Sequence, residues 1–112
     1  MKHSQQFLFD TFLPWDDLGN GLRRQIMGFN DNIMMVKVEF QVDGIGPMHH
    51  HIHSQSTYVV SGVYELTIDD ETKIIKAGDG FFVAPNIEHG VVCIEEGMLI
   101  DSFSPVREDF LK

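Results

Sequence analysis

Three histidines and one glutamine have the residue types and the spacing to bind a single metal ion. His49 and His51 are two residues apart, and Gln55 follows shortly after them. His89 comes 38 residues after His51. On a β-strand, residues two apart point to the same face, so the first two imidazoles can bind one ion together. Neutral imidazoles and an amide oxygen suit zinc, nickel, manganese, cobalt or iron, and they leave positions open for water or substrate. The sequence therefore predicts one divalent transition metal, whose identity these ligand types do not decide.

The neighbouring histidines are expected to take other positions. His50 should point away from His49 and His51, because successive residues of a strand face opposite sides. His53 is two residues after His51, so on a continuous strand it would face the same side as His49 and His51. It lies beyond an expected bend, however, and a supporting role for it stays open. One histidine on an apolar face is more often a core residue than a ligand. Three of them, in two segments with similar glycine and proline positions, favour a metal site.

Alternating apolar and polar residues predict that most of the chain forms β-strands. Residues 34–42 have the alternation of a half-buried strand. Residues 62–69 and 72–77 flank a short polar connection and should form a hairpin. Further strands are expected at 81–83, 91–94 and 98–103. Eight to ten short strands predict an all-β antiparallel barrel or jelly roll, with room inside for a packed core or one small ligand.

The two ends of the chain depart from this pattern. Residues 1–20 are expected to form an irregular arm with turns at Pro14 and at 19–21. Four aromatic side chains should pin this arm to the outside of the body: Phe7, Phe9, Phe12 and Trp15. At the other end, residues 105–112 have room for one helical turn.

Length and charge limit the functional classes. The 112 residues suffice for one domain, 1–112, with one core. Seventeen acidic residues against 8 basic ones give a net charge of −9, which argues against nucleic acids and anionic membranes as partners. The lone Cys93 cannot form an intrachain disulfide and fits a reducing compartment. The opening residues show no signal peptide and no segment approaches a membrane span, so we expect a cytoplasmic location.

A carboxylate near the end of the chain is a candidate for acid–base catalysis. Leu99, Asp101 and Phe103 share one face of an expected strand. An acid between apolar neighbours on an inward face is costly unless a metal or an arginine compensates it. Beside a metal-bound substrate, such a carboxylate can move protons. The alternative is that Asp101 points outward or forms an ion pair with Arg107.

Arg107 is a candidate for substrate binding. Its planar guanidinium matches a carboxylate with two hydrogen bonds, so the expected substrate is a small anion. The alternative is a surface ion pair with Glu108 or Asp109. Tyr58 is a candidate for the pocket wall, although aromatic residues at alternating positions are more often plain core.

Both ligand segments resemble the two motifs of the cupin superfamily. The first motif contains a glycine, His-x-His, an acid and a later glycine, here at Gly44, His49, His51, Gln55 and Gly62. The second contains a glycine, a proline and a histidine, here at Gly78, Pro85 and His89. The resemblance covers roughly residues 33–104 and implies a single cupin, a jelly-roll-like antiparallel barrel. Gln55 departs from the motif, because most cupins carry glutamate there.

The whole chain is similar to the KdgF family, the small cupins of pectin and alginate degradation. The similarity runs through residues 14–21, 34–36, 49–55, 89–92, 99–105 and 107–111. It implies a cupin that is often a homodimer and that converts 4,5-unsaturated monouronates, the products of polysaccharide lyases, into linear keto sugars. Carried over by position, the metal ligands are His49, His51, Gln55 and His89. In the same way Asp101 is the catalytic carboxylate, with Phe103 and Arg107 near the substrate.

The glutamine bears on which kind of cupin the chain resembles. Unlike glutamate, it cancels none of the charge of a bound dication, which can then polarise a substrate strongly. It also weakens the case for iron that activates oxygen. Two alternatives stay open: a metal-dependent cupin dioxygenase, and a non-enzymatic cupin that binds a sugar or a metal.

Overall fold

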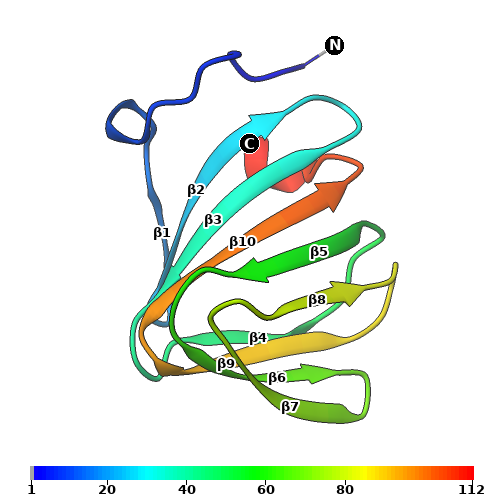
Figure 1. Ribbon diagram of the computed structural model, residues 1–112. Helices are drawn as coiled ribbons and strands as arrows, with labels where there is room; N and C mark the ends of the chain where they lie inside the picture. Colours follow the sequence, from blue (N-terminus) through cyan, green and yellow to red (C-terminus); the bar gives the residue numbers. More distant parts are fainter. Residues whose placement is uncertain (1) are drawn as a thin grey trace.

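Two antiparallel β-sheets face each other and form an open roll (Figure 1). The computed structural model describes residues 2–112, and within this range there are ten strands. The larger sheet has the order β1-β2-β3-β10-β5-β8, and the smaller has the order β4-β9-β6-β7. The strands are β1 Asp16–Gly19, β2 Leu22–Phe29, β3 Met34–Phe40, β4 Ile45–His49, β5 Ser54–Val59, β6 Val63–Ile68, β7 Glu71–Lys76, β8 Gly80–Val83, β9 His89–Glu95 and β10 Gly97–Ser104. The expected all-β jelly roll is confirmed.

The core lies between the two sheets and follows the period-two alternation. Along β3 every second residue is buried, from Met34 to Phe40, as the sequence predicts. Phe40 meets Tyr64 of the smaller sheet edge to face, with ring centroids 5.3 Å apart. Burying each such side chain contributes roughly 1.5–3 kcal/mol to folding. The hairpin of β6 and β7 also forms as predicted, with Ile68 paired to Glu71.

Strand β10 runs through the middle of the larger sheet and carries the candidate acid. It pairs with β3 on one side and with β5 on the other. The register sets Asp101 opposite Thr57 and Phe103 opposite Gln55. Leu99 and Phe103 are buried, so Asp101 between them also turns to the inside of the roll.

The N-terminal arm differs from expectation in two ways. Residues 16–19 form strand β1, which pairs with β2 through the turn at 19–21. Phe7, Phe9 and Phe12 do not pin the arm, because they are 74%, 59% and 83% exposed. Of the four expected aromatic anchors only Trp15 contacts the body, with its ring 4.2 Å from the guanidinium carbon of Arg23. The arm is also held by polar contacts, since the buried Gln25 side-chain amide donates to the carbonyl oxygens of Asp10 and Leu13.

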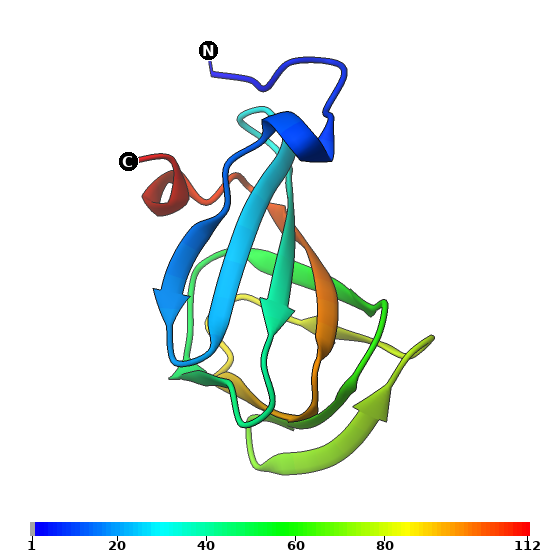
Figure 2. The same ribbon diagram turned by 90° about the vertical axis from the view of Figure 1, so that its left-hand side faces the viewer.

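The C-terminal end forms the expected short helical turn. It is a 3-10 helix, η2, at Glu108–Leu111. In Figure 2 this turn lies next to β1 and β2, and Phe110 and Leu111 pack against the core. Among the described residues, no helix has the length and apolar character needed to cross a membrane.

Candidate metal centre

The three histidines come from two segments that the smaller sheet brings side by side. His49 ends β4 and His89 begins β9, and the two residues are direct partners in the antiparallel register. His51 lies in the loop that follows β4, and its carbonyl oxygen accepts a hydrogen bond of 2.7 Å from the backbone N–H of Asn86. One ring nitrogen of each histidine lies within 4.8 Å of those of the other two. The convergence predicted from the spacing is therefore present.

Backbone carbonyl groups orient the three rings. Each ring places Nδ1 at 2.8–3.0 Å from a carbonyl oxygen: His49 from Pro47, His51 from His53, and His89 from Ile87. A carbonyl oxygen only accepts hydrogen bonds, so each Nδ1 must carry the proton. A neutral ring then presents Nε2 as an unprotonated acceptor, which is the form that binds a metal.

Burial favours the neutral form of two of these rings, His51 and His89. The pKa of His89 is lowered from its ordinary value to about 4, mainly by burial and to a lesser extent by the positive charges of neighbouring groups such as Arg107. Burial also lowers the pKa of His51. At neutral pH the Nε2 atoms of His51 and His89 therefore hold lone pairs rather than protons.

Gln55 adds an oxygen to this set of acceptors. Its Oε1 lies 3.0 Å from Nε2 of His51. The amide cannot be turned round without loss, because its NH2 group donates to Thr57 and to Asp101. Two acceptors thus face each other at hydrogen-bond distance, and a cation between them relieves the conflict.

His89 gives a second, independent indication of a missing positive partner. Its Nε2 is buried and has no hydrogen-bond partner. A buried polar atom without a partner costs roughly 1–3 kcal/mol, which is unusual in a native fold unless a ligand satisfies it. Three imidazole nitrogens and an amide oxygen fit a divalent transition metal with open positions.

Asp101 lies next to these ligands and is bound to them through Thr57. Its Oδ1 accepts a 2.6 Å hydrogen bond from the Thr57 hydroxyl and a 3.3 Å hydrogen bond from the Gln55 amide. Burial raises the pKa of Asp101 to about 6, against the lowering effect of these donors and of Arg107. A carboxyl group with that pKa can both accept and release a proton near neutral pH.

Arg107 is turned toward the inside of the roll. Its side chain is only 11% exposed, and Asp109 accepts hydrogen bonds from its Nε and Nη2 at 3.1 and 2.9 Å. The ion pair with Asp109 that the sequence left open is therefore present. Arg107 also stacks on Phe103, with its guanidinium carbon 5.0 Å from the ring centroid. It is close enough to Asp101 to lower the pKa of that residue.

Comparison with protein families agrees with this geometry. A family model described as "Cupin domain" matches residues 36–101, which run from within β3 to within β10 and include all four proposed ligands. The protein belongs to the cupin family. The pectin degradation protein KdgF of Dickeya dadantii (strain 3937) is 45% identical to this cupin over 109 residues, covering 96% of this chain and 99% of that protein. Such identity over nearly the whole length also places this cupin in the KdgF family.

Solved structures give the same assignment. An RmlC-like cupin from Shewanella frigidimarina NCIMB 400 superposes with a TM-score of 0.95 at 46% identity, covering 98% of this cupin and 99% of that chain. KdgF from Halomonas sp. superposes with a TM-score of 0.90 at 32% identity, covering 96% and 99%. Oxalate decarboxylase of Bacillus subtilis shares the fold, with a TM-score of 0.80 at 18% identity over 92% of this cupin and 30% of that chain.

Tyr58 is not brought to the metal centre of this cupin. It is 53% exposed on the outer face of the larger sheet. The alternation along β5 explains the difference, because Gln55, Thr57 and Val59 point inward and Tyr58 must therefore point outward. We remove Tyr58 from the expected substrate contacts.

The two remaining histidines of the first motif hold the loops of this cupin. His50 points away from the ligands as predicted, and its Nδ1 lies 2.8 Å from a carboxylate oxygen of Glu88 in the second ligand segment. His53 supports the site through its backbone, because its carbonyl oxygen accepts the hydrogen bond from His51.

Thr57 is the site residue that the sequence analysis missed. Its hydroxyl joins the amide of Gln55 to the carboxylate of Asp101. Two features of the sequence could have indicated it. Thr57 is two residues after Gln55 and so faces the same side of the strand, and a threonine on a buried strand face needs a hydrogen-bond partner. Neither feature names Asp101, because the pairing of β5 with β10 depends on the fold.

Proposed function

We propose that this cupin converts 4,5-unsaturated monouronates, such as those released by pectin or alginate lyases, into linear keto sugars. The relative from Dickeya dadantii, similar over nearly its full length, is named a pectin degradation protein. The observation that carries the proposal is the set of four acceptor atoms beside an acid. The acceptors are Nε2 of the three histidines and Oε1 of Gln55, and the acid is Asp101, with its pKa raised to about 6.

The metal ligands in this proposal are His49, His51, Gln55 and His89. A divalent ion bound there, whether zinc, nickel, manganese, cobalt or iron, supplies Lewis-acid polarisation of a substrate oxygen. The glutamine leaves the charge of that ion uncancelled, which favours binding of an anionic sugar.

Asp101 carries the proton in the proposed reaction. The anomeric hydroxyl loses its proton, the bond between the anomeric carbon and the ring oxygen breaks, and an aldehyde and an enol result. The enol then gains a proton at C4 and loses the proton of its hydroxyl group, which gives a ketone. The overall reaction is therefore an isomerisation that needs no co-reactant. Asp101 is suited to both transfers because its pKa of about 6 allows either protonation state to form readily.

Arg107 and Phe103 hold the sugar in this proposal. A guanidinium has five N–H groups, and Asp109 takes up two of them, so the others are free for the carboxylate of the uronate. Phe103 is buried on the same strand face as Asp101 and lies edge to face with His51 at 5.7 Å between centroids. The inward cation offsets the net charge of −9 locally.

The direct test follows the unsaturated monouronate with purified protein. We expect loss of its conjugated ultraviolet band and the appearance of a linear keto sugar by NMR. Asp101→Asn should keep its metal content and lose at least about 100-fold in kcat. Asp70→Asn, an exposed acid in the turn between β6 and β7, should match the wild type. Binding of the uronate without conversion, or consumption of oxygen, would refute the proposed reaction.

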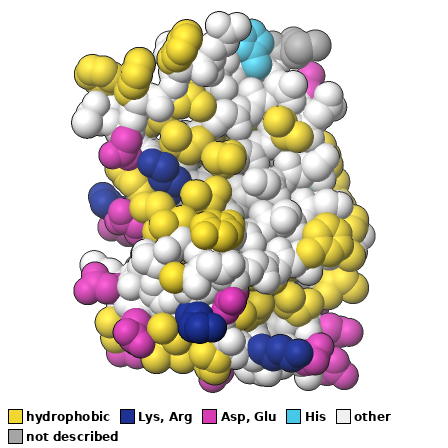
Figure 3. Space-filling view, viewed as in Figure 1, with side chains coloured by type: hydrophobic (Ala, Val, Ile, Leu, Met, Phe, Trp, Pro, Cys, Tyr) yellow, Lys and Arg dark blue, Asp and Glu magenta, His cyan; other side chains and the backbone are white. Residues whose placement is uncertain are grey.

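The proposal extends to a homodimer in the cytoplasm. The outer face of the larger sheet exposes Met35, Tyr58 and Phe82 by 44%, 53% and 61%, and Figure 3 shows hydrophobic side chains spread over this face. A second copy that covers them would remove this apolar surface from water. Light scattering should give twice the 12.8 kDa chain mass, and Phe82→Asp should give the monomer. A monomeric wild type would exclude the dimer.

The proposed location in the cytoplasm agrees with the cysteine content of the chain. The reducing cytoplasm suits the buried free thiol of Cys93.

A further inference from the structure

Two arginine and two phenylalanine side chains inside the roll stack together, with each guanidinium on an aromatic ring. The guanidinium carbon of Arg24 lies 3.8 Å from the ring centroid of Phe110, and that of Arg107 lies 4.2 Å from the same ring. Arg107 in turn lies 5.0 Å from the ring of Phe103. Phe103 and Phe110 also meet edge to face, with ring centroids 5.7 Å apart, so the stack joins β2, the C-terminal turn and β10.

Arg24 reaches this stack from the inner face of β2. It pairs with Val38, and its neighbours Leu22 and Ile26 pack on the core. Its side chain is only 20% exposed. The nearest acid, Asp16, lies 3.9 Å from its Nε, which is beyond hydrogen-bond distance, and that Nε has no other partner. The guanidinium of Arg24 therefore combines a loose ion pair with Asp16 and a close contact with the ring of Phe110.

We propose that Phe110 and Arg24 are positioning residues that hold the guanidinium of Arg107 in place for the carboxylate of the substrate. This inference rests on the proposed function, in which Arg107 binds a uronate. Both guanidinium groups contact the ring of Phe110, so both cations are attracted to one ring. Because the two positive charges repel each other, the shared ring is what favours their being close together.

The geometry of Arg107 explains why such support matters. Asp109 binds the Nε and Nη2 edge and fixes one side of the guanidinium. Contact with the rings of Phe103 and Phe110 limits how far the guanidinium plane can tilt or rotate. The remaining N–H groups of Arg107 therefore point in a fixed direction. An arginine side chain loses rotamer entropy when it is fixed against a ligand, and restricting it before binding lowers that cost.

The test separates positioning from simple packing. Phe110→Leu keeps an apolar side chain but removes the ring, and Arg24→Met removes the cation at similar length. Each should raise KM for the unsaturated monouronate at least about fivefold and change kcat less than about twofold. Phe110→Tyr keeps the ring and should restore KM. Metal content and thermal midpoint should stay close to the wild type.

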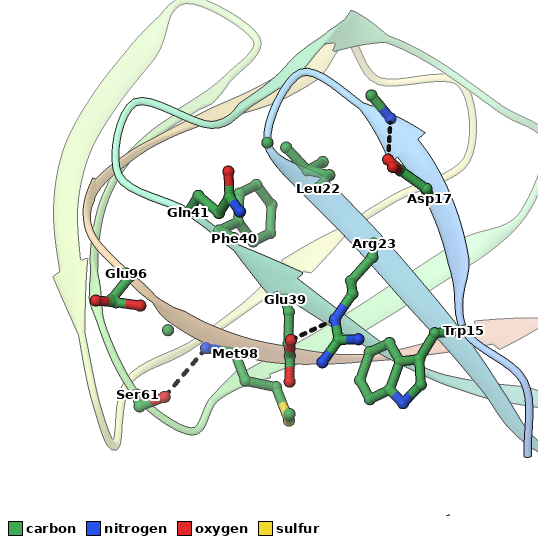
Figure 4. Close-up of a pocket in the computed structure, with 13 residues that line it drawn as sticks. Trp15, Asp17, Leu22, Arg23, Glu39, Phe40, Gln41, Ser61, Glu96 and Met98 are labelled. Atoms are coloured by element: carbon green, nitrogen blue, oxygen red, sulfur yellow. Dashed lines mark hydrogen bonds and ion pairs between the residues drawn. The ribbon is translucent and has the colours of Figure 1, made fainter.

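The matched control is a second cation–aromatic pair on the outside of the molecule. Arg23 lies 4.2 Å from the ring of Trp15 and is paired with Glu39 (Figure 4). Trp15→Leu removes this ring far from the ligands and should leave KM and kcat unchanged. If Trp15→Leu raised KM as much as Phe110→Leu, the effect would be general and the inference would be wrong.

The outcomes keep the two proposals apart. If the wild type does not convert the monouronate, the proposed function fails, and the positioning role is then tested by calorimetric binding of galacturonate. There Phe110→Leu should weaken Kd at least about fivefold relative to the wild type, and galactose should bind no variant. A wild-type KM in active Phe110→Leu and Arg24→Met, or an unchanged Kd, would overturn the inference. If Phe110→Leu does not fold, Arg24→Met decides alone.

Discussion

Gln55 stands where most cupins carry glutamate, and its amide has two functions at once. The oxygen faces Nε2 of His51, while the nitrogen donates to Thr57 and to Asp101. A glutamate could supply the oxygen but no donor, and it would bring a second negative charge next to Asp101. The departure from the motif is therefore explained by the acid beside the ligands.

Gln55→Glu tests this explanation. Like charges in one site raise the pKa of one of the two acids, so Asp101 should hold its proton to higher pH than in the wild type. We expect the variant to bind metal at least as tightly, because it gains an anionic ligand. At pH 7 its kcat should fall at least about tenfold, and the lower limb of its pH–rate profile should move to higher pH. An unchanged profile with full metal content would contradict this reading.

Asp101 should reduce the stability of the metal-free protein at neutral pH. Its pKa is raised from an ordinary value near 4 to about 6, so the folded state binds the proton more tightly than the unfolded chain. Below pH 4 Asp101 is protonated in both the folded and the unfolded protein, and the folded state has its full stability. As the pH rises through 6, Asp101 must ionise in its buried position, and the free energy of unfolding falls. Two pKa units correspond to at most about 3 kcal/mol of unfolding free energy.

Asp101→Asn should remove that penalty while keeping an acceptor for Thr57. Urea unfolding of the chelator-treated variant at pH 7.5 should give a free energy about 1–3 kcal/mol above the wild type. The difference should shrink toward zero at pH 4. Equal stabilities at both pH values would show that ionised Asp101 carries no such cost.

At the level of strands and turns, period-two alternation predicted most of the fold correctly. It gave β3, the β6–β7 hairpin and the inward face of β10, because each of these has one buried and one exposed face. The same rule, applied from Gln55 along β5, would have placed Tyr58 outside. The position of the arm was not fully predicted because its phenylalanines are exposed, and because the Gln25 side-chain amide holds it by donating to backbone carbonyl oxygens.

At the end of the roll opposite the C-terminal turn, the connection between β5 and β6 passes very close to the connection between β9 and β10. Gly97, at the start of β10, lies so near Ser61 and Gly62 that a Cβ atom there would overlap their backbone. Gly78 has the left-handed φ of +93° but open space around it. The two glycines are therefore required for different reasons, one by space and one by backbone angle.

Alanine substitution separates these reasons. Gly97→Ala must displace backbone atoms and should lower the unfolding free energy by about 3 kcal/mol or more. Gly78→Ala adds only left-handed strain and should cost about 1 kcal/mol. Chemical denaturation of both variants measures the difference. A cost for Gly97→Ala no greater than that for Gly78→Ala would mean that the two connections relax easily.

For the whole molecule, the motif spacing predicted which ligands meet but not how they are oriented. His49, His51 and His89 converge as expected because β4 and β9 are neighbours. The carbonyl groups that fix the ring tautomers come from residues next to each ligand, and no residue type encodes them. The stack of Arg24 on Phe110 was also beyond sequence reasoning, since it joins residues 86 positions apart.

The distribution of charge over the whole molecule supports binding of an anion, although the protein is acidic. The chain carries a net charge of −9, yet Arg24 and Arg107 are turned inward, with side chains 20% and 11% exposed. A dication in the adjacent site would make the interior more positive still. A neutral sugar gains nothing from this field, so uronates should be preferred over the corresponding neutral sugars.

The central claim is that one divalent ion, held by the three histidines and Gln55, is required for turnover. The most direct measurement is titration of the metal-free protein with a divalent metal, following bound metal and the loss of the ultraviolet band of the unsaturated monouronate in the same samples. The rate should rise in proportion to bound metal, stop at about one ion per chain, and stay at background in His89→Ala. Full turnover by the metal-free protein, or a rate that does not follow the bound ion, would contradict the account.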